Sequence, residues 1–219
     1  MNKIILLLIA FTPSVLFAQK TRIYWDKETK ETYYVLKTDE KIKHGEYLKY
    51  GGNNIVLVRG YYKMGVKDSI WESCNWKGQL SIKYDYSKKE LIFFEPGENE
   101  KSRKYKVITG NRTIDTTLSR PPIFLLGEGY LLNELMRNVR YPREAAKNGK
   151  SGKVIVAFTV DKDGKATNHR VQNPVGFGLD EEALRVAKLL PDEWLPGLLN
   201  GQPVDVEVNF PIKFSLGDD

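Results

Sequence analysis

The sequence predicts an α+β fold, in which an N-terminal all-β meander precedes a C-terminal domain of about three antiparallel strands and two helices. Three features support this prediction. Residues 204–216 place an apolar side chain at every second position, which is the period of a half-buried strand. Residues 44–86 repeat loosely at an offset of 24 residues, with recurring aromatic side chains. Residues 131–190 contain helical apolar patterns on either side of a hairpin signal.

The composition indicates an ordinary folded protein that is exported. The chain has 219 residues, of which 41% are hydrophobic and 28% charged, enough for one or two modest cores. Residues 1–18 contain Lys3, then an uncharged run and Ala18, which is typical of a secretory signal peptide cleaved near Ala18. The run is shorter than the roughly twenty apolar residues that a membrane span needs, so an uncleaved anchor is the weaker alternative.

The reactive residue types are too sparse for a catalytic site. Cys74 is the single cysteine and lies between Trp71 and Trp76, where we expect it to pack. The two histidines, His44 and His169, have no nucleophile or carboxylate in a recognisable setting. We therefore expect no enzyme activity, no cofactor and no small-molecule substrate, and an enzyme is the weakest of three hypotheses.

A calcium loop is the alternative to a turn at Asp161 and Asp163. The residues that follow, Lys165 to Thr167, do not supply the further oxygen ligands that such a loop needs. An Asp-Gly pair between two alternating runs is typical of a hairpin. No metal site is predicted.

The positive charge lies mainly before residue 126, within a formal net charge of +6. Such a charge usually belongs to a solvated face, and an anionic envelope surface is the alternative partner. We expect no nucleic-acid partner, because the chain is exported and contains no recognised nucleic-acid motif.

Residues 19–95 are predicted to form the β-repeat region. Tyr47 aligns with Trp71, and Tyr62 aligns with Tyr86, as Gly45 does with Ser69. Each unit is a strand, a turn, a second strand and a connector, and such units must stack to bury a face. Residues 96–125 are polar and are predicted to be a linker, although residues 105–108 have strand character.

Residues 126–219 are predicted to form the C-terminal domain. A helical pattern covers residues 131–137, and Pro142 is well placed to start a short helix that ends near Gly149. Two runs of alternating apolar and polar residues, each predicted to be a strand, meet at Asp163-Gly164. Acidic residues after Gly178 open a second amphipathic helix that Pro191 ends. The long alternating strand follows.

Two sets of motifs resemble known families. The patterns HGEYLKY, GYYKMG and DSIWESCNWKGQL resemble the MORN-like repeats of the YwqK antitoxin-related family. The succession YPREA, GKVIVAFTVDKDGKA, GLDEEALRVAKLLPDEWLPG and NGQPVDVEVNFPIKFSL resembles the TonB C-terminal domain. The second resemblance implies binding of a short periplasmic segment of an outer-membrane TonB-dependent transporter, or a similar envelope protein, by strand addition. It also implies a periplasmic location in a Gram-negative envelope.

This resemblance places the partner-binding residues on the last strand and before the short helix. Pro211 lacks an N–H group, so we expect its main-chain groups to face the open edge of the sheet, where no hydrogen bond to a neighbouring strand is lost. Because backbone direction alternates along a strand, Asp205, Glu207, Asn209 and Lys213 are then expected to offer their main-chain groups to a docked strand. The predicted set is Val204, Asp205, Val206, Glu207, Val208, Asn209, Phe210, Lys213, Arg140 and Tyr141.

The chain also departs from an energy transducer of that family. Residues 4–18 contain no histidine for a proton-driven motor, and repeats replace the proline-rich spacer. The alternative hypothesis is a non-energised envelope scaffold that acts mainly through its repeats. An open edge strand also permits a homodimer.

Overall fold

The computed structural model describes residues 21–96, 103–110 and 112–216. Within these ranges no helix is long and apolar enough to cross a membrane. The predicted signal peptide, residues 1–18, lies outside the described part of the chain.

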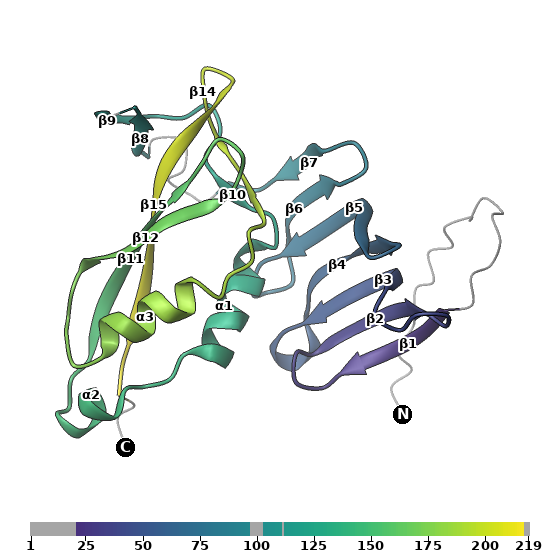
Figure 1. The fold of residues 1–219 in the computed structure, drawn as a ribbon, viewed down its shortest axis with the longest axis horizontal. Helices are drawn as coiled ribbons and strands as arrows, with labels where there is room; N and C mark the ends of the chain where they lie inside the picture. Colours follow the sequence, from purple (N-terminus) through teal and green to yellow (C-terminus); the bar gives the residue numbers. More distant parts are fainter. Residues whose placement is uncertain (1–20, 97–102, 111, 217–219) are drawn as a thin grey trace.

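The N-terminal half is one antiparallel sheet whose seven strands follow each other in sequence order (Figure 1). A 3-10 turn, Gly52–Asn54, lies between the third and fourth strands. The strands are β1 (Thr21–Asp26), β2 (Glu31–Leu36), β3 (Lys43–Tyr50), β4 (Val56–Lys63), β5 (Val66–Cys74), β6 (Leu80–Asp85) and β7 (Glu90–Phe94).

Residues at the predicted offset of 24 occupy equivalent places in this sheet. Gly45 and Ser69 both have positive φ, at 123° and 57°. The rings of Tyr47 and Trp71 stack with centroids 5.4 Å apart, and Tyr62 meets Trp71 edge to face at 5.1 Å. Gly60 allows this packing, because a Cβ there would lie 2.1 Å from the Trp71 indole. The periodic aromatic residues therefore form one continuous cluster.

The C-terminal half is a second antiparallel sheet with strand order β12-β11-β15-β8-β9. The central strands are β11 (Gly152–Val160) and β15 (Gln202–Phe214), which pair from Gly152↔Phe214 to Val160↔Val206. The other strands of this half are β8 (Tyr105–Thr109), β9 (Arg112–Thr116), β12 (Ala166–Asn173) and β14 (Gly197–Leu199).

Three helices accompany this sheet, where two helices and about three strands were predicted for the domain. They are α1 (Gly127–Asn138), α2 (Arg143–Lys147) and α3 (Leu179–Ala187). The apolar stripe of α3, including Leu179 and Ala183, packs on Val156, Phe210 and other even-numbered residues of β11 and β15. This stripe was expected from the helical spacing of the sequence.

The predicted linker is largely built into the fold. Residues 105–109 and 112–116 are β8 and β9, and β10 (Ile123–Phe124) pairs with β13 (Trp194–Leu195). The prediction of a linker is wrong for these residues. The physical reason is burial: Val107 is 0% exposed and packs on Val206, itself 0% exposed.

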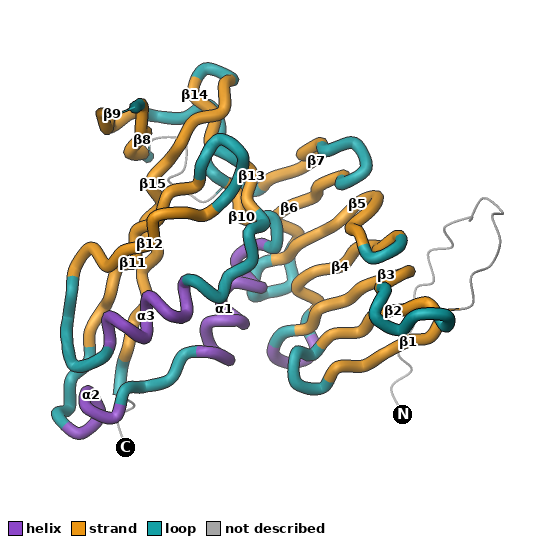
Figure 2. The backbone as a smooth tube through the Cα atoms, viewed as in Figure 1, coloured by secondary structure: helices purple, strands orange, loops and turns teal. Residues whose placement is uncertain are grey.

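The two halves share a hydrophobic core. Trp71 of the first sheet packs in one cluster with Phe124 and Leu126, and Trp194 lies against it. Helix α1 lies between the two sheets (Figures 1 and 2) and approaches β5 closely, since a Cβ on Gly129 would lie 2.5 Å from the Cys74 carbonyl oxygen. The boundary predicted at residue 126 is therefore not a break in packing.

Polar contacts reinforce this junction. The Nζ atom of Lys49, only 1% exposed, lies 2.9 Å from Glu134 of α1 and 3.4 Å from Glu31. Lys67 reaches Glu193 at 2.7 Å, and the Ser73 hydroxyl donates to the Leu125 carbonyl oxygen at 2.6 Å. A buried ion is costly unless it is paired, so these contacts fix how the halves meet.

Candidate peptide-binding edge

Strand β15 carries its two chemical faces on alternate residues. Phe210, Ile212 and Phe214 are buried against α3, whereas Asn209, Pro211 and Lys213 are exposed. This is the alternation that the sequence predicted. It directs the odd-numbered side chains to the face of the sheet away from the helices.

The hydrogen bonds of the neighbouring strand β11 show which residues of β15 direct their N–H and C=O groups toward β11. The Asp161 N–H donates to the Lys165 carbonyl oxygen at 2.9 Å, so the odd-numbered residues at this end of β11 face β12 and the even-numbered ones face β15. In the unbroken register between β11 and β15, even residues pair with even residues. The main-chain groups of odd-numbered residues in β15 therefore point away from β11, and the missing N–H of Pro211 lies on that side.

The first half of β15, residues 202–207, is closed by the chain itself. Val204 pairs with Gly197 of β14. Asp205, Val206 and Glu207 lie opposite Ile108, Val107 and Lys106 of β8. The expectation of an open edge is thus wrong for Asp205, Val206 and Glu207, because β8 fills the position beside them. It is also wrong for Val204, whose main-chain groups face β14.

The second half of β15, residues 208–214, is open on the side away from β11. Within the described ranges, no strand pairs with it on that side and no further backbone hydrogen bond reaches it. Asn209 and Lys213 direct both main-chain groups to this edge, and Pro211 directs its carbonyl. Val208 and Phe210 belong to the inward-facing set, so they shape the edge without offering main-chain groups.

An ion cluster marks the junction between these two halves. The Glu207 carboxylate contacts the Arg170 guanidinium and lies 3.5 Å from the Lys106 Nζ atom of β8. Partial burial opposes ionisation of Glu207, but Arg170 and Lys106 outweigh it and hold the pKa of Glu207 below its ordinary value. The cluster therefore ties β8, β12 and β15 together on one face.

The two predicted residues outside β15 lie near its C-terminal end in different ways. The Tyr141 ring meets Phe214 edge to face at 6.0 Å, and its hydroxyl donates to the Lys150 carbonyl oxygen at 2.5 Å. Tyr141 therefore adjoins the open half. Arg140 instead donates its backbone N–H to Glu182 of α3 at 2.7 Å.

Glu182 is itself fixed by charge. Its hydrogen bond with Arg185, followed by the Arg140 N–H, keeps the pKa of Glu182 below its ordinary value despite partial burial. The Arg140 backbone is thus committed to the fold.

The cysteine and the cavity-lining histidine lie apart from this edge, in different surroundings. Burial raises the pKa of the Cys74 thiol. Phe158, His169, Asp192 and Trp194 line a cavity of about 140 Å³, below the 300–1,000 Å³ common for ligand pockets. Burial, with nearby Lys188, lowers the pKa of His169. Among the residues that the structure describes, no three His, Cys, Asp or Glu side chains are grouped to hold a metal ion.

Sequence reasoning missed the strand that closes half of the edge. Its residues, Lys106 to Ile108, had visible strand character, but the pairing with β15 spans about a hundred positions of chain. No local pattern specifies such a partner.

The site and fold define a mixed α/β protein with a partly open strand edge on its C-terminal sheet. Residues 137–216 match the family described as Gram-negative bacterial TonB protein C-terminal. This segment spans less than half of the chain, includes β15, and excludes β8, β9 and the seven-stranded sheet. The match supports a TonB-like protein of the Gram-negative envelope. Comparison with curated proteins and with solved structures found no match.

Proposed function

We propose that the protein is a periplasmic, non-catalytic adaptor that binds an extended segment of an outer-membrane transporter. The segment adds as a strand to residues 208–214 of β15, and this binding supports TonB-dependent transport across the outer membrane. The family match of residues 137–216 is consistent with this role.

One observation carries the proposal. On one side, strand β15 pairs with β14 over residues 202–204 and with β11 over residues 206–214, but on its other side β8 stops at Glu207. The main-chain groups of Asn209 and Lys213 are thus left beside a rigid, packed sheet. A preformed edge of this kind binds an extended peptide through main-chain hydrogen bonds.

The test is a binding titration with the full chain. Fluorescent peptides covering the periplasmic N-terminal segments of outer-membrane transporters from the same organism are measured by anisotropy. Asn209→Pro removes an outward N–H group and is expected to weaken binding at least tenfold. Asp115→Pro, on the outward side of β9 at the far edge of the same sheet, is the matched control and is expected to leave binding unchanged.

Two outcomes would contradict the proposal. One is that no segment binds to the wild-type chain. The other is that Asn209→Pro and Asp115→Pro bind as tightly as the wild type.

A second candidate is a scaffold that acts through the seven-stranded sheet. The observation that favours it is strand β1, which within the described ranges pairs only with β2 and in which Ile23 and Trp25 are each 55% exposed. Because the two halves share a core, single variants are more informative than separate halves. Loss of envelope partners from Trp25→Ser, with retention in Asn209→Pro, would favour the scaffold.

A further inference from the structure

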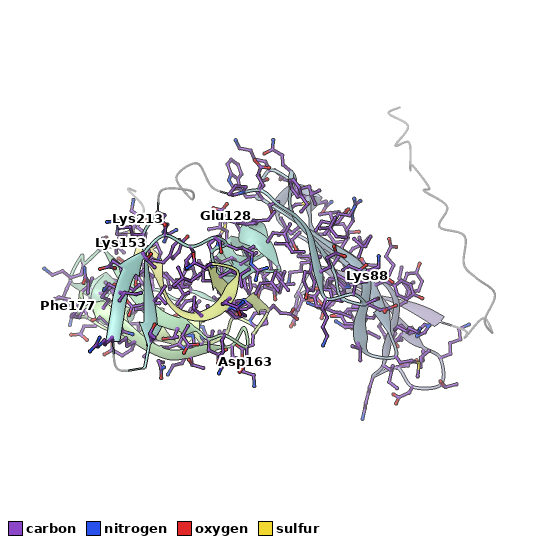
Figure 3. All side chains as sticks on the ribbon, turned by 90° about the horizontal axis from the view of Figure 1, so that it is seen from above. Lys88, Glu128, Lys153, Asp163, Phe177 and Lys213 are labelled. Carbon is purple, nitrogen blue, oxygen red and sulfur yellow. The ribbon has the colours of Figure 1, made fainter. Side chains whose placement is uncertain are left out.

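The open half of β15 has an unbalanced charge on the face away from the helices. Lys213 lies directly opposite Lys153 of β11, so both side chains project from the same face. Both are exposed, and Figure 3 shows them at neighbouring positions on one side of the C-terminal sheet. Like charges directly opposite each other disfavour a sheet, so this pair is not explained by folding stability.

Neither lysine has an acidic partner among the residues that the structure describes. Within the described part of the chain, the side chains of Lys153 and Lys213 take part in no ion pair or hydrogen bond. The two positions between them and the closed half are uncharged: Ile155 pairs with Pro211, and Ala157 pairs with Asn209. The open half thus presents two positive charges and no negative one on this face.

The closed half shows the opposite situation. Glu207 contacts Arg170 and Lys106, and Asp115 of β9 lies opposite Lys106. The Asp205 carboxylate accepts the Lys162 N–H at 2.8 Å. Charges of both signs therefore meet where the chain supplies its own neighbouring strand, whereas the charged side chains on this face of the open half are both positive.

We infer that the segment bound at residues 208–214 is acidic, with carboxylate side chains on the face that carries Lys153 and Lys213. This inference rests on the proposed function. On an added strand, side chains directly opposite Lys213 would have Cβ atoms about 4.5–5.5 Å from it, within reach of an ion pair. The lysines thus select the sequence of a segment that main-chain bonds alone would hold without selection.

The geometry also sets the length and alternation of this segment. Residues 208–214 offer room for about seven residues before β8 blocks further extension. Side chains on the other face of the added strand would lie beside the half-buried Val208 and near Tyr141, whose ring packs on the buried Phe214. The expected ligand alternates acidic and apolar residues.

A second copy of the chain fits this edge less well. Antiparallel self-pairing centred on Pro211 would place two residues without an N–H group opposite each other. It would also add two further lysines and no acid to the same face. A foreign acidic strand satisfies both the main-chain groups and the charges.

The test uses three seven-residue peptides that alternate valine with glutamate, glutamine or lysine. Binding to the full chain is measured by fluorescence anisotropy at low and at high salt. The glutamate peptide is expected to bind at least tenfold more tightly than the glutamine peptide, with the difference shrinking at high salt. The double variant Lys153→Glu/Lys213→Glu is expected to prefer the lysine peptide.

A matched control has the same change of charge elsewhere. Lys162→Glu/Lys165→Glu alters two exposed lysines of the β11–β12 turn, at the other end of the sheet, and is expected to keep the preference for glutamate. Residues 218 and 219 are both aspartate, so the variant Asp218→Asn/Asp219→Asn controls for their charge and is also expected to keep the preference for glutamate.

The outcomes separate the inference from the function on which it rests. Equal binding of the glutamate and glutamine peptides to the wild type would overturn the inference while leaving strand addition intact. Binding of none of the peptides, with a dimer that Asn209→Pro dissolves in size-exclusion chromatography, would overturn both and assign the edge to a second copy.

Discussion

The two halves of β15 differ in what lies beside them, although they form one continuous strand. Residues 205–207 have β8 on the side away from β11, and Val206 is 0% exposed. Residues 208–214 have β11 on one side and, within the described ranges, no strand on the other. One strand can therefore be closed by its own chain over one part of an edge and left open over another, and the open part is the binding site that we propose.

The largest effect is expected from removing single main-chain N–H groups on the two sides of β15. Val208→Pro removes an N–H group that faces β11, so we expect the free energy of unfolding to fall by about 2–4 kcal/mol. Asn209→Pro removes one that faces the open edge, and we expect less than about 1 kcal/mol. Urea denaturation of both variants measures the difference. Equal losses would mean that the assigned directions are incorrect.

Opening the closed half is the next test. Val107 is buried against Val206, and Val107→Ala is expected to cost about 1–3 kcal/mol through lost burial and a residual cavity. The docking of β8 should weaken, so hydrogen exchange at Asp205 and Glu207 should accelerate and peptides longer than seven residues should gain affinity.

The matched control for that variant is Ile114→Ala in β9. Ile114 is 45% exposed, so we expect a change within about 0.5 kcal/mol. Unchanged exchange at Asp205 in Val107→Ala would show that β8 does not protect this half.

A smaller effect is expected from pH. The pKa of Glu207 is held below its ordinary value of 4.5, so its contribution to stability is present above that value and is lost as pH falls through the depressed pKa. The protection of the β8 amides against exchange, relative to the intrinsic rate at each pH, should therefore fall in acid more than the protection of the β11 amides. Glu207→Gln should flatten this pH dependence. If the pH dependence persists in Glu207→Gln, other carboxylates cause it and the expectation for Glu207 is wrong.

The sequence contained enough information for the strand and for its outward side. Period-two alternation predicts a half-buried strand, and Pro211 predicts which side lies away from the neighbouring ladder. The apolar stripe of α3 and the Asp163-Gly164 hairpin were also predictable, because each depends on residues that are close together in the sequence. The structure agrees with these elements.

The closure of residues 202–207 was not predictable in the same way. β8 is five residues long within a polar stretch, and its register with β15 depends on the burial of Val107 against a strand about a hundred residues away. The shared core of Trp71, Phe124 and Trp194 is non-local for the same reason. Short-range periodicity predicts that one face of a strand or helix is buried, but it does not predict which other element packs on that face.

Hydrogen exchange of the β15 amides in the free protein tests the central claim most directly. The account predicts slow exchange at Asp205 and Glu207, which bond to β8, and at Val208, Phe210 and Ile212, which bond to β11. It predicts fast exchange at Asn209 and Lys213. Slow exchange at Asn209 and Lys213 in a monomeric sample would contradict it, because this edge would then already be occupied.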